Sequence, residues 1–265
     1  MREALIVTMV FMLVLIPKAA CSNPAMPSLS SPAPNSSVIV ATDEWPPFRI
    51  SIDKKGGFTG FDIDLLQALS AKTGIQFNVK RYPWARALSH MEIGQVDMMV
   101  GLAKTAEREQ FIDYIPTSYY HCRPAFYTQK DIPKPINSYQ DLYFYRVGYV
   151  LDSAYFEPFD SDDAMVKHGV PTEIQLLRMA KKGHLEVFIG TDCQVEYEIN
   201  KRGLWQQLSK AAYQPKQDLA LYIGFSKLSN HRYLSSKIEQ ALKELMIEPE
   251  FTEIKARYFG REDLY

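Results

Sequence analysis

The stretch IQFNVKRYPWARALSHMEIGQVDMMV, residues 75–100, decides the fold class of this chain. Its first five residues alternate apolar and polar side chains, which predicts a β-strand. From Trp84 to Met91, four apolar residues have the spacing of one helix face, and Gly94 ends that helix. Residues 96–100 are a short apolar run typical of a buried strand. A strand, a helix and a second strand in this order predict a parallel pair with a crossover helix.

The same alternation extends towards the N-terminus. Residues 38–41 are an apolar run that predicts a first buried strand. An apolar face from Ile63 to Leu69 predicts a helix, which Asp62 caps and Gly74 ends. The first part of the chain therefore predicts a parallel sheet with helices on its faces.

The pattern restarts downstream and predicts a second α/β lobe. The expected elements are a short capped helix at 138–142, strands at 145–150, 185–189 and 219–225, a helix near 194–201, a C-terminal helix with an apolar face from Leu234 to Leu245, and a last helix after Pro249. Thr172 caps a further helix, with Ile174, Leu177 and Ala180 inward. Two α/β lobes bind ligands between them, at the carboxyl ends of their strands.

Composition narrows the class of partner. The chain has 265 residues, of which 46% are hydrophobic, so it can bury a large core. Its net charge of -1 argues against nucleic acid as the partner, because neutralising phosphates requires a basic face. Sixteen Tyr, 14 Phe and three Trp suit a cleft for a small molecule, although most aromatic residues are core.

The N-terminal residues predict export. Arg2 precedes an apolar run, residues 4–16, which Pro17 and small residues follow. Residues 1–22 are therefore predicted to be a signal peptide, since the run is short for a membrane anchor, the alternative. Residues 23–37 are rich in Ser and Pro and predict a flexible tether. The predicted location is the periplasm, where disulfides are permitted.

Three cysteines leave alternatives open. Ala19-Ala20-Cys21 resembles the end of a bacterial lipoprotein signal, in which the cysteine is acylated, although Lys18 departs from that motif. The protein is then either free or tethered to the membrane through Cys21. Cys122 and Cys193 are either a disulfide or two buried thiols, because sequence spacing does not show whether their Cα atoms approach.

Common catalytic and cofactor motifs are absent from the sequence. It contains no GxGxxG, Walker, GxSxG or HExxH motif, and its five His residues lack the spacing of metal ligands. We therefore predict no cofactor, no metal site and no catalytic residue.

Five short motifs carry a family resemblance. They are GFDIDL at 60–65, GQVD at 94–97, TAER at 105–108, PTSYY at 116–120 and RYFG at 257–260. Their order and spacing resemble the family 3 bacterial extracellular solute-binding proteins, the polar amino-acid binders of ABC importers. The resemblance covers about residues 38–260.

This resemblance implies a two-lobed periplasmic-binding-protein fold of type II, which is α/β and has two hinge crossovers. Lobe 1 is expected at 38–121 and 225–265, and lobe 2 at 122–224. Such a protein closes on its ligand by hinge motion and needs no second copy, so a monomer is expected.

Within the first lobe, the resemblance implies that Arg108 pairs with a ligand carboxylate, which a guanidinium holds through two parallel hydrogen bonds. Thr105 lies at a helix start, which also attracts an anion. Trp45 and Trp84 match pocket aromatics of the family, and a place in the core is the alternative for each.

The strand end at Gly101 and Ala103 is also expected at the ligand. The family usually has Ser or Thr where Ala103 stands, which helps to hold the ligand ammonium. Alanine cannot do so through its side chain, and this departure favours a more acidic ligand or one without the ammonium.

Within the second lobe, Ser153 is expected to donate a hydrogen bond to the ligand. Asp152 stands where the family often has Gly, a change that affects the loop shape. By counting, Thr191 takes the place of a family Asp that binds the ligand ammonium, and Asp192 follows one residue later. Asp192 is therefore either a ligand contact or a helix cap.

Three functions follow from the resemblance. The first is a solute-binding protein that captures a small carboxylate-bearing ligand and delivers it to an ABC permease. The second is a periplasmic dehydratase of cyclohexadienyl acids, whose general acid is expected among Glu44, Asp192 and Glu196. The third is a binding protein that presents its ligand to a membrane sensor.

Overall fold

The computed structural model describes residues 37–52 and 57–260, which lie in one structural unit, Asn35–Tyr265. The predicted signal peptide at 1–22, the predicted acylation site Cys21 and all but the last residue of the predicted tether lie outside the described residues. Within the described ranges, no helix combines the length and the apolar character that crossing a membrane requires.

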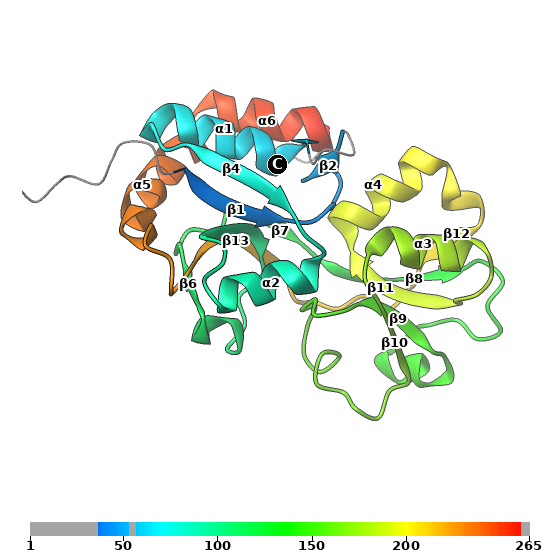
Figure 1. Ribbon diagram of the computed structural model, residues 1–265. Helices are drawn as coiled ribbons and strands as arrows, with labels where there is room; N and C mark the ends of the chain where they lie inside the picture. Colours follow the sequence, from blue (N-terminus) through cyan, green and yellow to red (C-terminus); the bar gives the residue numbers. More distant parts are fainter. Residues whose placement is uncertain (1–36, 53–56, 261–265) are drawn as a thin grey trace, which may run out of the picture. The chain divides into compact units, whose positions relative to one another are not determined.

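The first lobe is built on a mixed sheet (Figure 1). Its strands are β1 (Val38–Thr42), β4 (Phe77–Arg81), β5 (Met98–Leu102), β6 (Ile112–Tyr114), β7 (Tyr120–Cys122) and β13 (Leu219–Ser226). The order is β4-β1-β5-β13-β6, and β7 pairs with β13. The predicted parallel arrangement holds for β4, β1 and β5. The strand β13 returns from the second lobe and lies antiparallel to β5.

Helices of the first lobe follow the predicted apolar faces. They are α1 (Phe61–Thr73), α2 (Trp84–Glu92), α5 (Ser235–Met246) and α6 (Pro249–Phe259), and α1 and α6 lie side by side in Figure 1. The expectation that Asp62 caps α1 is wrong, because the N-cap is Gly60 and no side chain caps the helix. A Cβ on Gly60 would meet the carbonyl oxygen of Phe48 at 2.3 Å, so only glycine fits this position.

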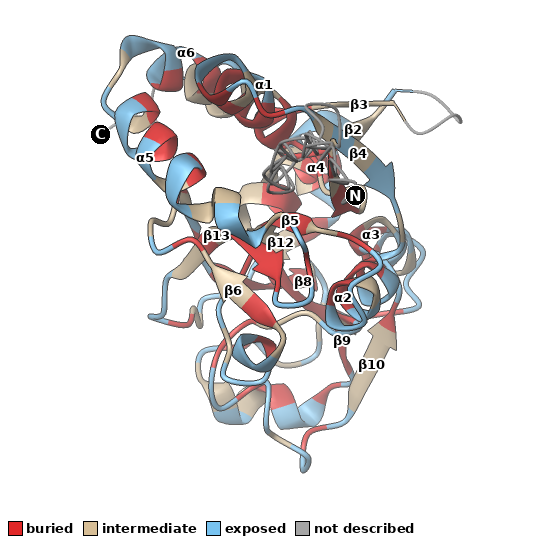
Figure 2. Ribbon diagram, turned by 60° about the vertical axis from the view of Figure 1, so that its left-hand side comes forward, coloured by how far each residue is buried: buried red, intermediate tan, exposed pale blue. Residues whose placement is uncertain are grey.

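The second lobe is built on a sheet of its own. Its strands are β8 (Pro124–Gln129), β9 (Val147–Val150), β10 (Lys167–Val170), β11 (Val187–Thr191) and β12 (Leu208–Lys210), in the order β10-β9-β11-β8-β12. The first three strands of this order are parallel, and β8 and β12 are joined to them in antiparallel pairing. Two helices, α3 (Glu173–Lys181) and α4 (Asp192–Arg202), pack on the sheet. The two lobes bury separate hydrophobic cores, and Figure 2 shows buried segments in the strands and on inner helix faces.

The start of α3 differs from its sequence-based prediction in one respect. Thr172 caps the helix as predicted, since its side chain accepts a hydrogen bond from the Gln175 N–H. Leu177 is buried as predicted, whereas Ile174 is half-exposed. Glu173 is buried in its place. The inward face of the helix therefore begins with an acidic residue.

The remaining elements are short. They are the hairpin β2 (Ile50–Ser51) and β3 (Phe58–Thr59) and the 3-10 turns η1 (Arg108–Gln110), η2 (Tyr139–Phe144), η3 (Leu204–Gln206) and η4 (Arg232–Leu234). The capped turn predicted near residue 138 is η2, with a capping box between Ser138 and Asp141.

The chain passes between the sheets twice, from β7 to β8 and from β12 to β13. The lobe boundary expected at residue 225 falls inside β13, which belongs to the first sheet. Cys122 at the end of β7 and Cys193 in α4 form a disulfide, with a Cα–Cα distance of 5.6 Å. Such a cross-link restricts the unfolded chain and typically stabilises a protein by about 2–4 kcal/mol.

Candidate functional site

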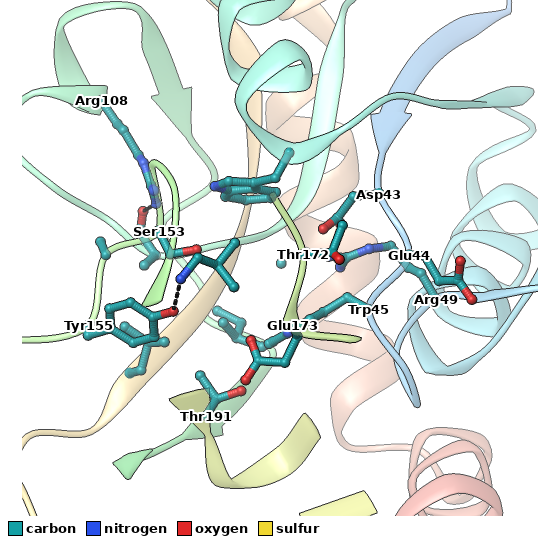
Figure 3. Close-up of a pocket in the computed structure, with 17 residues that line it drawn as sticks. Asp43, Glu44, Trp45, Arg49, Arg108, Ser153, Tyr155, Thr172, Glu173 and Thr191 are labelled. Carbon is teal, nitrogen blue, oxygen red and sulfur yellow. Dashed lines mark hydrogen bonds and ion pairs between the residues drawn. The ribbon is translucent and has the colours of Figure 1, made fainter. Parts of the chain in front are cut away.

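A cavity of about 60 Å³ is lined by residues of both sheets, and Figure 3 shows the side chains around it. In the first lobe, residues that come after β1 and residues at the end of β5 form its walls. In the second lobe, residues at the end of β9 and just after it line the cavity, together with the end of β11 and the start of α3. Carboxyl ends of parallel strands therefore meet at the cavity, as expected for a ligand site.

Most of the predicted ligand contacts lie on this cavity. They are Trp45, Trp84, Gly101, Ala103, Arg108 and Ser153. Thr105 and Asp192 are not among the lining residues. The side-chain oxygen of Thr105 accepts a hydrogen bond from the Arg108 N–H at 3.2 Å. Thr105 thus holds the turn that carries Arg108.

Arg108 is a buried cation without a carboxylate partner. It is 6% exposed, and it forms no ion pair with any described residue. Its Nη1 donates to the carbonyl oxygen of Ala103 at 3.0 Å, and its Nη2 to that of Asp152 at 2.7 Å. Burial lowers the pKa of Arg108. A buried guanidinium that lacks a counter-ion suits an anionic ligand.

Asp152 keeps the loop conformation that a glycine would favour. Its φ of 57° is left-handed, a region that aspartate tolerates better than most residues. In this conformation its carbonyl oxygen accepts hydrogen bonds from Arg108 Nη2 and from Trp84 Nε1, the latter at 3.0 Å. The replacement of the expected Gly therefore leaves the loop able to contact the first lobe.

A second buried arginine, Arg49, contrasts with Arg108. It is 1% exposed, and its Nη atoms pair with Asp62 and, at 2.8 Å, with Asp43. Burial alone would lower the pKa of Arg49, but the two carboxylates outweigh it and raise the pKa. Its guanidinium carbon lies 5.0 Å from the centre of the Trp45 ring, on the cavity wall. The charge of Arg49 is therefore already balanced within the protein.

Glu173 is a lining residue that the sequence patterns did not predict. It is 6% exposed, and its Oε1 has no hydrogen-bond partner among the described residues. Burial, with a contribution from Asp43, raises the pKa of Glu173 to about 8. Thr191, also on the cavity, is 5% exposed and its hydroxyl is likewise unpartnered within the described part of the chain. Figure 3 shows both side chains at the cavity.

The three acids that the sequence offered as candidate general acids are either paired or lie at another cavity. Glu44 lines the cavity, but it is paired with Arg81 at 2.9 Å. Asp192 and Glu196 line a different cavity, beside the disulfide. The carboxylate of Asp192 accepts from the backbone N–H of Arg123 and of Cys193, and Glu196 pairs with Lys210. None of these three is a free carboxyl at the lobe-lined cavity.

Comparison with known proteins settles the family. The model of the bacterial extracellular solute-binding proteins, family 3, matches residues 38–261. The chain belongs to this family. The predicted membership is thereby confirmed.

Relatives and solved structures agree with this membership. The chain is 24% identical over 226 residues to the probable amino-acid-binding protein YxeM of Bacillus subtilis, with 84% of this chain and 83% of the relative covered. It is 26% identical to the probable ABC transporter arginine-binding protein ArtJ of Chlamydia trachomatis, with 83% and 84% covered. An ancestral arginine-binding protein bound to arginine superposes with a TM-score of 0.74 at 21% identity, over 86% of this chain and all of that one. A histidine kinase sensor domain superposes with a TM-score of 0.75 at 20% identity, over 84% and 96%. The predicted two-lobed type II fold is confirmed.

Proposed function

We propose that this protein is a periplasmic solute-binding protein that captures a carboxylate-bearing ligand, in the first place an amino acid, and delivers it to an ABC importer. The observation that carries the proposal is Arg108, a buried guanidinium on the cavity with no carboxylate partner among the described residues. The relatives YxeM and ArtJ, named as amino-acid-binding and arginine-binding, support the ligand class.

In this function, the ligand carboxylate replaces the carbonyl oxygens as acceptors of the Arg108 hydrogen bonds. Because Asp152 belongs to the second lobe and Arg108 to the first, a ligand between them contacts both lobes. Trp45 and Trp84 supply flat apolar walls on the same cavity. Opening and closing of the lobes around the two crossings gives the ligand entry and release. Residues 1–22 direct export, and the following segment links the domain to the membrane if Cys21 is acylated.

The test is calorimetric titration of the purified protein with the twenty amino acids, preceded by a thermal-shift screen. A true ligand at a hundred times its Kd adds about 2.7 kcal/mol of apparent stability. Arg108→Ala is expected to weaken binding roughly tenfold to a hundredfold, since a hydrogen bond to a charged group contributes about 1.5–3 kcal/mol. Arg178→Ala, an exposed arginine on α3, is the matched control.

Two results would overturn the proposal. Binding that is unchanged in Arg108→Ala contradicts the carboxylate site, and the Arg108→Lys variant shows whether charge alone suffices. Failure of all twenty amino acids to bind contradicts the ligand class. Ligand-dependent uptake in membrane vesicles that contain the cognate permease separates the importer role from ligand presentation to a sensor, the third function above.

A second candidate, the dehydratase, is favoured by one observation. Glu173 is a carboxyl on the cavity whose raised pKa keeps it largely protonated at neutral pH, as a general acid requires. The candidate is tested by incubating the protein with prephenate and measuring the aromatic product. Turnover that is lost in Glu173→Gln supports the enzyme, and binding without turnover excludes it for this substrate.

A further inference from the structure

The Cys122–Cys193 disulfide joins the two lobes directly, at the first crossing of the chain. Cys122 is the last residue of β7 and pairs with Leu219 of β13 in the first sheet. Cys193 is in the first turn of α4, which packs on the second sheet. Cys122 is buried in the core of the first lobe, and the half-exposed Cys193 packs against that same core. The cross-link therefore ties α4 to the opposite lobe; Figure 1 shows β7 and α4 on different lobes.

Hydrogen bonds hold the next residue of this crossing to the second lobe. The N–H of Asp192 donates to the carbonyl oxygen of Arg123 at 2.9 Å, and the N–H of Arg123 donates to the Asp192 carboxylate at 2.8 Å. The pairing continues into the sheet, where Pro124 lies opposite Thr191. The residues on the two sides of Cys122 are thus attached to different lobes. The pivot of the first crossing is therefore confined to Cys122 and the bonds next to it.

The second crossing is less constrained. It runs through residues 211–218, all of them described, which form neither helix nor strand. Arg123 and Asp218 link the two crossings at 3.0 Å, but both side chains are exposed, so their ion pair contributes little. A disulfide, by contrast, keeps its two Cα atoms within about 7 Å of each other. While it is intact, the start of α4 cannot move away from β7, and the lobes open only by rotation about this contact.

We propose that the Cys122–Cys193 disulfide is a reducible restraint on the hinge, which limits the opening of the lobes and slows ligand release, and which a dithiol reductant removes. The inference rests on the proposed function, in which the lobes open and close around the two crossings. After reduction, Cys122 stays in the first sheet while Cys193 moves with α4. Wider openings then become accessible, and a bound ligand leaves faster.

A reductant reaches the disulfide without entering the ligand site. Both cysteines line a second cavity, of about 840 Å³, which shares no lining residue with the ligand cavity. A thiolate of the reductant attacks the Sγ of the half-exposed Cys193, the S–S bond breaks, and the Cys122 sulfur leaves as a thiolate that takes a proton. The second thiol of the reductant then displaces the Cys193 thiolate, which is protonated in turn. Two electrons thus pass to the cysteines, and the dithiol becomes a disulfide.

The experiment compares the native protein with the double variant Cys122→Ser/Cys193→Ser, at a temperature where both are folded. Small-angle X-ray scattering without ligand is expected to give the variant a larger radius of gyration, because its lobes open wider. Dissociation of L-arginine, followed by stopped-flow fluorescence of the tryptophans on the ligand cavity, is expected to be roughly tenfold faster in the variant. Dithiothreitol, a dithiol, is expected to produce both changes in the native protein. The double variant treated with dithiothreitol is the matched control and stays unchanged.

The outcomes separate this inference from the proposed function. A double variant that unfolds at a lower temperature but keeps the native radius of gyration and dissociation rate overturns the inference, since the disulfide then only stabilises the fold, and it leaves the importer role intact. A disulfide that resists dithiothreitol in the folded protein overturns it as well. Absence of binding for L-arginine and for every other amino acid overturns the proposed ligand class, while the scattering without ligand still decides the restraint. If the double variant does not fold, the native protein treated with dithiothreitol decides.

Discussion

Arg49 in the first lobe and Glu173 in the second are buried ionisable groups beside the same cavity, and their surroundings are opposite. In the first lobe, Arg49 is enclosed by Asp62 and Asp43, and the hydroxyl of Tyr119 donates to Asp62 at 2.8 Å. In the second lobe, Glu173 is also buried but has no counter-ion among the described residues. Burying an unpaired ionisable group costs free energy, so the second arrangement weakens the folded state.

This difference separates a buried charge that stabilises the fold from a buried group that is available to a ligand. The Arg49 cluster joins the strand end after β1 to α1 and holds the wall that carries Trp45. The charge of Arg49 is already balanced by two carboxylates, so it offers a ligand anion little. Glu173 and Thr191 instead keep their bonding capacity for a partner from outside. Strain or unmet bonding at a site is a cost that ligand binding recovers.

The largest expected effect is the loss of a paired charge. Asp62→Ala leaves Arg49 without one of its carboxylates and removes the acceptor of the Tyr119 hydroxyl. Breaking a buried pair from one side costs about 3–5 kcal/mol. Urea unfolding of the ligand-free protein measures this loss. A loss below about 1 kcal/mol would mean that the cluster does not hold the first lobe together.

The second prediction concerns the unpaired acid. The folded-state pKa of Glu173, about 8, lies above its ordinary value of 4.5, so the folded protein holds the proton more tightly. Stability from this group is complete below about pH 4.5 and is lost as the pH rises to 8. Glu173→Gln cannot lose a proton there, so its free energy of unfolding falls less steeply with pH. At pH 7 the gap between the two proteins is expected to have changed by about 3 kcal/mol relative to pH 4.

The difference between the two curves isolates Glu173 from the other acids. Burial also raises the pKa of Asp160 to about 6, but Asp160 is present in both proteins and cancels. Any constant penalty from burying the glutamine amide shifts the whole curve without changing its slope. Parallel curves would show that Glu173 is ionised in the empty cavity and would remove the observation that favours the dehydratase candidate.

Sequence patterns predicted the fold well because the apolar spacing that indicates each helix or strand lies within neighbouring residues. The helix face from Trp84 to Met91 is buried, and the strands before and after it are paired through β1, as the alternation of residues 75–100 indicates. Order and spacing of five motifs added the family, and most residues carried over from it line the cavity. Arg108 was found in this way, since its motif specifies it.

Two acids at helix starts show why the rest was not predictable. Asp62 and Glu173 both have the position of an acid in the first turn of a helix, for which capping or solvent exposure is the ordinary interpretation. Asp62 turns inward because the buried Arg49, which lies outside this helix, requires a carboxylate partner. Glu173 turns inward because Gly190 leaves room for it. The apolar periodicity predicted that Ile174 lies on the buried face of this helix. The sequence feature that points to Glu173 instead is the glycine on the facing strand.

The smallest expected effect concerns the threonine hydroxyl beside Glu173. Thr191→Val keeps the branched shape and removes a buried hydroxyl that has no partner among the described residues, so the ligand-free protein is expected to gain up to about 1 kcal/mol. Thr73→Val is the matched control, because that hydroxyl donates to the Leu69 carbonyl at 2.6 Å and accepts from Ile75. It should lose about 1–2 kcal/mol.

Thermal unfolding of the two variants without ligand measures both differences. A Thr191→Val protein that is destabilised without ligand would show that its hydroxyl is already satisfied in the empty cavity. The contrast with the Arg49 cluster would then rest on Glu173 alone.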